Sequence, residues 1–104
     1  MSDKFQESAL RTWHVNLAWE LQYDHAVLGL VGEAGEVANQ HKKNVFKPGH
    51  EADLYDRLDE LVDVFYYLLI LAHLNGKTLD DLLLFMERKL QDGHGWQPDN
   101  YNRE

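Results

Sequence analysis

The stretch Gly32-Glu33-Ala34-Gly35-Glu36 carries two carboxylates three residues apart, and Glu60-Leu61-Val62-Asp63 carries a second pair with the same spacing. On a helix, residues three apart lie on one face. Glu36 and Glu60 are equally distant in sequence from Pro48, and so are Glu33 and Asp63. If the chain reverses near Pro48, the four carboxylates come level with one another on two facing helices and can share a cation.

Apolar residues recur with helical periodicity in four segments, which predicts an all-α fold. The segments cover about residues 3–24, 25–43, 53–75 and 78–90. Between the second and the third, Lys47-Pro48-Gly49 breaks the helix and supplies a turn. We expect residues 1–92 to form one four-helix-bundle-like domain. Residues 93–104 are rich in Gly, Pro, Asn and Asp, which favours an irregular tail.

The second and third predicted helices each have an apolar stripe opposite a polar one. In the second, the apolar stripe comprises Val27, Leu30, Val31, Ala34, Val37, Ala38 and His41, and the polar stripe comprises Glu33, Glu36 and Gln40. In the third, the apolar stripe comprises Leu54, Leu58, Leu61, Phe65, Leu68, Leu69 and Ala72, and the opposite one comprises Asp56, Glu60, Asp63 and Tyr67.

Beyond Asp63 the third predicted helix is apolar all round, which requires burial on more than one side. In so short a chain, a second copy of the protein is the expected cover. We therefore predict a homodimer or homotetramer in which Phe65, Tyr66, Ile70 and Leu71 divide between the protomer core and the interface.

Three glycines, Gly29, Gly32 and Gly35, recur at three-residue spacing inside the second predicted helix. Each glycine in a helix costs about 0.5–1 kcal/mol relative to alanine. Close approach of another group would compensate for that cost. Two alternatives remain open: tight packing of a neighbouring helix, or close approach of a ligand or metal.

Composition narrows the classes of partner and compartment. The 104 residues contain no Cys and no apolar run longer than nine residues, so we expect a cytoplasmic protein without a membrane span. The net charge of −8 argues against nucleic acid as the main partner. It is compatible with a phosphorylated small molecule held through divalent cations.

The four carboxylates favour a hard cation, because an all-oxygen ligand set suits Mg²⁺ and also Mn²⁺. No His or Cys belongs to the cluster, which argues against zinc. The chain has no Glu-x-x-His, no His-Asp dipeptide and no Gly-x-x-x-x-Gly-Lys loop. These absences argue against a ferritin-like di-iron site, the usual motif of helical phosphohydrolases and a P-loop.

The acidic motifs resemble those of the all-alpha nucleoside triphosphate pyrophosphatases of the MazG type. Residues 28–37 and 59–68 carry the resemblance, because Glu33, Glu36, Glu60 and Asp63 match the family pattern of Glu-x-x-Glu, a spacer and Glu-x-x-Asp. The similarity extends over roughly residues 10–90. It implies that Mg²⁺, held by the four acids, supports attack of a water on the α-phosphorus of a nucleoside triphosphate, giving the monophosphate and pyrophosphate.

The resemblance also indicates substrate-binding residues. Lys89 lies where the family tends to place a phosphate-contacting lysine, although Met86 and Gly93 depart from the family pattern nearby. Lys42 and Lys43 follow the first acidic pair by about two turns, and surface lysines are the alternative for all three. For the base, the first helix would supply Trp13 or His14.

The alternative for Trp13 is a place in the core, whereas His14 points away from the apolar stripe. Trp19 and Tyr67 are candidate stacking partners. Two alternatives to the predicted activity remain: a phosphoribosyl-ATP pyrophosphohydrolase-like enzyme, and a non-enzymatic acidic helical module that binds a partner.

Overall fold

The computed structural model describes residues 2–49 and 51–92, and these residues form four helices and no strand. The helices are α1 (Ser2–Leu10), α2 (Trp19–Phe46), α3 (Leu54–Leu74) and α4 (Leu79–Asp92). The predicted all-α class is confirmed. The predicted irregular tail lies outside the described residues. None of the described helices combines the length and the apolarity that a bilayer crossing demands.

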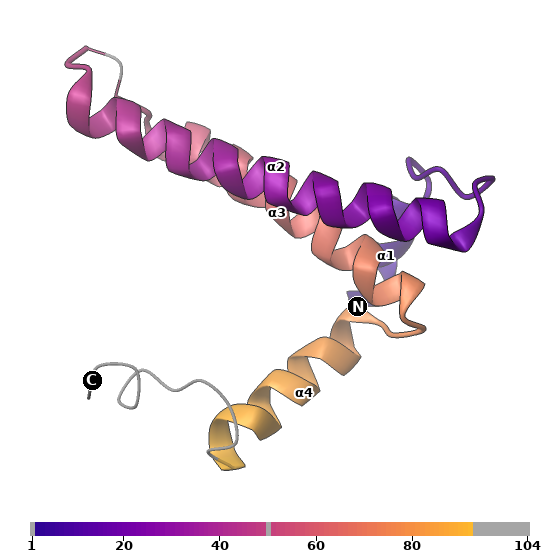
Figure 1. The fold of residues 1–104 in the computed structure, drawn as a ribbon. Helices are drawn as coiled ribbons and strands as arrows, with labels where there is room; N and C mark the ends of the chain where they lie inside the picture. The colour runs from indigo at the N-terminus through magenta and orange to yellow at the C-terminus, as the bar shows by residue number, and fades with distance from the viewer. Residues whose placement is uncertain (1, 50, 93–104) are drawn as a thin grey trace.

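The two longest helices, α2 and α3, form an antiparallel hairpin (Figure 1). Gly49 adopts a φ of 87° in the turn, a conformation that favours glycine. Asp53 begins α3 with a capping box, in which its side chain accepts from the Asp56 amide at 2.8 Å and the Asp56 side chain accepts in return. The reversal near Pro48 is therefore as predicted.

The predicted first helix over residues 3–24 was wrong, because residues 11–18 break it into α1 and the start of α2. The break begins where the Thr12 and Trp13 amides bond to carbonyls three residues back, at 3.1 and 3.2 Å. Trp13 is thereby buried in the core, and its indole Nε1 donates to Gln22 Oε1 at 2.9 Å. The second helix consequently starts at Trp19 rather than at residue 25.

The core lies at one end of the hairpin, where α1 packs against α3. Its buried side chains are Ala9, Trp13, Ala26, Leu69, Ile70 and Leu74. Gln6 is buried beside them and donates to the backbone carbonyls of Leu69, at 3.2 Å, and Lys77, at 3.1 Å. This one side chain fastens α1 to α3 and to the junction before α4.

The fourth helix, α4, lies near α1 and α3 and diverges from α2 (Figure 1). Thr78 and Asp81 open it with reciprocal hydrogen bonds. Residues 80–92 are all exposed. A single chain is thus a hairpin flanked by two helices, and the closed four-helix bundle stays a prediction.

The hairpin turns its polar stripes inward. Glu33 and Gln40 of the polar stripe of α2 are half-buried, as are Glu60, Asp63 and Tyr67 of α3, whereas Glu36 and Asp56 are exposed. Much of both predicted apolar stripes is exposed, including Val31 at 64% and Leu61 at 53%. Of the residues expected to divide between core and interface, Ile70 is buried, Tyr66 and Leu71 are half-buried and Phe65 is exposed.

Candidate metal centre

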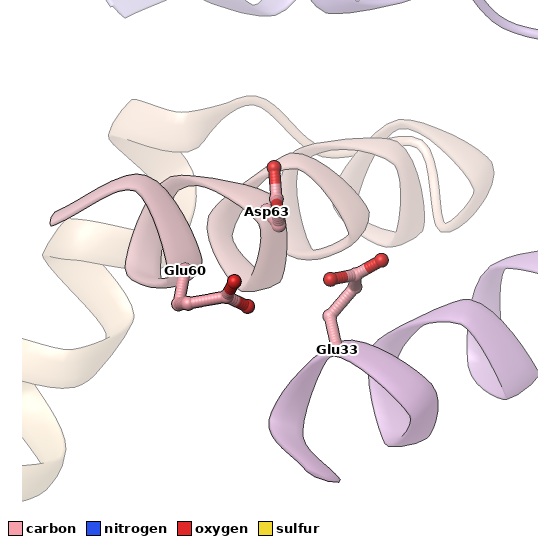
Figure 2. Close-up of side chains that lie close together, drawn as sticks. All are labelled: Glu33, Glu60 and Asp63. Carbon is pink, nitrogen blue, oxygen red and sulfur yellow. The ribbon is translucent and has the colours of Figure 1, made fainter. Parts of the chain in front are cut away.

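Three of the four predicted carboxylates converge between α2 and α3 (Figure 2). Glu33 comes from α2, and Glu60 and Asp63 come from successive turns of α3. One carboxylate oxygen from each lies within 4.8 Å of those from the other two. The antiparallel hairpin produces this convergence, because it sets the acidic turn of each helix opposite that of the other.

The electrostatics of this trio favour a bound cation. Oε2 of Glu60 is buried and has no hydrogen-bond partner within the described residues. Burial raises the pKa of Glu60, and the negative charges of Asp63, Glu36, Glu33 and Asp59 raise it further. A buried oxygen that lacks a donor and is surrounded by like charges is stabilised by a proton or a metal ion.

The donor set fits the predicted metal. All three groups offer carboxylate oxygens, which suit Mg²⁺ and Mn²⁺. Three protein ligands leave room for waters or substrate oxygens on the ion, as Mg²⁺ normally retains. Glu33, Glu60 and Asp63 are therefore the residues that would hold it.

Glu36 lies beside the trio and is exposed. It lines a polar hollow of about 310 Å³ together with Glu60, and its negative charge helps to raise the pKa of Glu60. The predicted set of four thus separates into three converging carboxylates and one that lies beside them.

The predicted lysines fall into different surroundings. Lys43 lines the same polar hollow as Glu36 and Glu60, and it is the one lysine among the described residues that does so. Lys42, one residue earlier on α2, is exposed and does not line the hollow. Lys89 is exposed on α4, where it borders a separate hollow with Phe85, Arg88 and Asp92. Within one chain, Lys89 is not brought to the acidic hollow.

Among the predicted base-binding residues, Trp13 belongs to the core, because it is only 7% exposed and its ring nitrogen bonds to Gln22. His14 is exposed, as its place off the apolar stripe predicts. Trp19 donates its Nε1 to the Leu74 carbonyl at 2.8 Å, which joins the start of α2 to the end of α3. That bond gives Trp19 a structural role.

Tyr67 lies beside both the acidic trio and an aromatic cluster, which comprises Trp13, His14, His25 and Tyr66. Its ring packs against Gly29 and lies edge-on to Trp13, with ring centroids 6.3 Å apart. Burial raises the pKa of the Tyr67 hydroxyl, and the charge of Glu33 is the next cause. Tight packing therefore explains Gly29, whereas a side chain at Gly32 or Gly35 would meet open space.

His25 is a candidate site residue that sequence reasoning missed. Its ring lies 4.9 Å from that of His14 and 5.2 Å from that of Trp13, centroid to centroid. It also lines an open hollow of about 470 Å³ with Leu28 and Gly29. The available signal was spacing, because residues at 25, 29 and 33 share one face of a helix.

Comparison of the chain with protein families, with curated proteins and with solved structures finds no match.

Proposed function

We propose that this protein is a Mg²⁺-dependent nucleoside triphosphate pyrophosphohydrolase that releases a nucleoside monophosphate and pyrophosphate. The observation that supports it most is the convergence of Glu33, Glu60 and Asp63 around a buried, unpartnered oxygen of Glu60. The choice of a nucleoside triphosphate rests on the resemblance of the acidic motifs to those of the MazG-type enzymes.

The proposal gives each group around the trio a separate task. Glu33, Glu60 and Asp63 would hold Mg²⁺, which would neutralise phosphate charge and make a water more acidic for attack on the α-phosphorus. Glu36, outside the trio, accepts the proton of that water. Lys43, on the rim of the same hollow, contacts the phosphates.

The base would occupy the other end of this face of α2. His25 precedes Glu33 by eight residues, a rise of about 12 Å along the helix. The exposed His14 and the hollow beside His25 lie at that end, and Tyr67 lies between it and the acids. The arrangement offers an aromatic end for a base and an acidic end for metal-bound phosphates.

A substrate panel tests the activity. The protein should hydrolyse at least one of a set of ribonucleoside and deoxyribonucleoside triphosphates in Mg²⁺, and chelator should abolish the reaction. In ¹⁸O-labelled water, the label should enter the monophosphate, because attack is at the α-phosphorus. Cleavage of phosphoribosyl-ATP alone would favour the related pyrophosphohydrolase, and cleavage of no substrate would favour the non-enzymatic module.

Two substitutions separate metal binding from proton transfer. Glu33→Gln should abolish both activity and the thermal stabilisation that Mg²⁺ gives the wild type. Glu36→Gln should keep that stabilisation and lower kcat by about 10²–10⁴-fold, the usual contribution of a general base. Asp59→Asn, which removes a neighbouring charge from an exposed acid on α3 but leaves the trio intact, is the matched control and should change both properties far less than Glu33→Gln.

Equal effects of Glu33→Gln and Asp59→Asn on Mg²⁺ stabilisation would contradict the metal site. Full activity of Glu36→Gln would contradict its role as proton acceptor while leaving the metal site intact.

A further inference from the structure

Two histidines lie together at a distance from the acidic trio. His14 belongs to the segment between α1 and α2, and His25 lies near the start of α2. Their ring centroids are 4.9 Å apart, and the ring planes are tilted by 42°. His25 is separated from Glu33 along α2 by a rise of about 12 Å. The histidine pair is therefore distinct from the candidate metal centre.

The buried ring of Trp13 fixes the positions of both imidazoles. Its centroid lies 5.4 Å from that of His14 and 5.2 Å from that of His25. Trp13 Nε1 donates to Gln22 Oε1 at 2.9 Å, so the segment that carries His14 is attached to the helix that carries His25. The Leu17 amide donates to the His14 carbonyl at 3.2 Å, which holds the backbone of that segment. The pair thus forms without a bound ligand.

The ring nitrogens of the pair are available to a ligand. Both side chains are exposed, and neither ring forms a hydrogen bond with another residue in the part of the chain that the structure describes. A neutral imidazole offers the lone pair of one ring nitrogen to a metal ion. The open hollow of about 470 Å³ beside His25 is otherwise lined by Leu28 and Gly29, so it leaves room for water on such an ion.

The separation of the rings suits two imidazoles that bind the same ion. A Zn–N bond is about 2.0–2.1 Å and the nitrogen is about 1.15 Å from its ring centroid, so each centroid is about 3.2 Å from the ion. Two such centroids are about 5.2 Å apart at the tetrahedral angle and about 4.5 Å apart at a right angle. The separation of 4.9 Å between His14 and His25 lies between these values.

We propose that His14 and His25 form a second metal site, which binds a divalent transition ion of the class that prefers imidazole, such as Zn²⁺. Imidazole nitrogen suits Zn²⁺ and Cu²⁺, whereas Mg²⁺ prefers oxygen ligands. The histidine pair and the acidic trio therefore select different ions. The site goes beyond the proposed hydrolysis, which uses the carboxylates and Mg²⁺.

Isothermal titration calorimetry with Zn²⁺ tests the proposal on the full chain. Millimolar Mg²⁺ in the buffer competes with Zn²⁺ for the carboxylates. His14→Gln and His25→Gln should each weaken Zn²⁺ binding by at least about tenfold, since even a residue behind a metal ligand contributes that much. His73→Gln, which changes an exposed histidine in the last turn of α3, is the matched control and should keep the wild-type affinity.

Two results of the titration would overturn the proposal. If each single variant of the pair loses only half of the bound Zn²⁺, the two histidines bind separate ions. If Glu33→Gln weakens Zn²⁺ binding as much as His25→Gln does, the ion belongs to the acidic trio. The histidine pair requires instead that Glu33→Gln keep the wild-type Zn²⁺ affinity.

Histidine footprinting covers the case in which a variant disturbs the packing around Trp13. Diethyl pyrocarbonate modifies exposed imidazoles, and mass spectrometry of the digested wild type measures the rate at each histidine. Zn²⁺ should slow modification of His14 and His25 and leave the rate at His73 unchanged. Unchanged rates at His14 and His25, or equal slowing at His73, would overturn the proposal. Neither experiment measures hydrolysis, so its failure leaves the proposed function intact.

Discussion

Replacing Gly29 with alanine tests the packing of the Tyr67 ring of α3 against α2. A Cβ atom at this position would lie 2.8 Å from Cδ1 of Tyr67, and closer still to Cε1 and Cζ. Carbon atoms in contact normally lie about 3.5–4.0 Å apart. Relief of the clash would therefore require about 0.7 Å of movement at Cδ1 and more at Cε1 and Cζ.

The surroundings of Tyr67 resist that movement. Its ring stands edge-on to Tyr66, with centroids 5.2 Å apart, and edge-on to Trp13 in the core. Overpacking of this kind typically costs about 1–3 kcal/mol. Removing a glycine from a helix returns about 0.5–1 kcal/mol. Gly29→Ala should then lower the free energy of unfolding by about 0–2.5 kcal/mol.

Gly32→Ala is the matched control, because its Cβ would meet no atom within 4 Å. It should gain the same helix propensity without the clash and stabilise the protein by about 0.5–1 kcal/mol. Urea unfolding of both variants at one protein concentration measures the difference, expected to be about 1–3 kcal/mol. If Gly29→Ala proves as stable as Gly32→Ala, the packing argument fails.

Variants at Glu60 and Thr78 test the electrostatics and the capping. The pKa of Glu60 is raised in the folded protein, and such a carboxyl contributes stability below that pKa and loses it above. In chelator, the wild type should therefore become more stable as the pH falls from neutrality through the pKa of Glu60. Glu60→Gln should flatten this rise in thermal unfolding experiments, and an unchanged slope would contradict the burial argument. Thr78→Ala should cost about 1 kcal/mol in urea unfolding, since its hydroxyl accepts from the Asp81 amide at 3.1 Å, whereas Thr78→Ser should keep the cap. Hydrogen bonds with Thr78 lower the pKa of Asp81, so the stability that the ionised Asp81 carboxylate contributes should persist above the ordinary value of 3.8 and fall away as the pH drops through the lowered pKa.

The position of the acids was predictable because it depends on two simple facts, the helical repeat and the place of the turn. Glu33 and Glu36 share a face only to within about 60°, as three residues turn a helix by about 300°. Glu33 lies close to the contact line with α3, so Glu36 is turned out to the side of the hairpin. The sequence predicts the acidic pairs, but not which member of a pair reaches the middle.

The break over residues 11–18 could not be predicted in the same way. Phe5, Ala9, Trp13 and Leu17 continue a helical repeat through it, and neither Gly nor Pro marks the spot. The chain turns there because burial of Trp13 and its bond to Gln22 outweigh the continued helix. Those are tertiary contacts, which a local pattern does not contain.

The inward polar stripes have a similar explanation. An apolar stripe shows that a surface needs cover, but not whether the cover is the neighbouring helix or another chain. In this hairpin the facing sides carry Glu33, Gln40 and Glu60, and the apolar sides face outward.

The hydrogen bonds of Gln6 determine when α1 can dock during synthesis of the chain. The carbonyls that Gln6 binds lie 63 and 71 residues further along the chain, and α1 packs only against α3 and α4. At translation rates of about 5–20 residues per second, the ribosome takes on the order of 4–14 s to add 71 residues. Of the four described helices, α1 is therefore the first to be made, but it can dock only once α3 and the junction before α4 have been made.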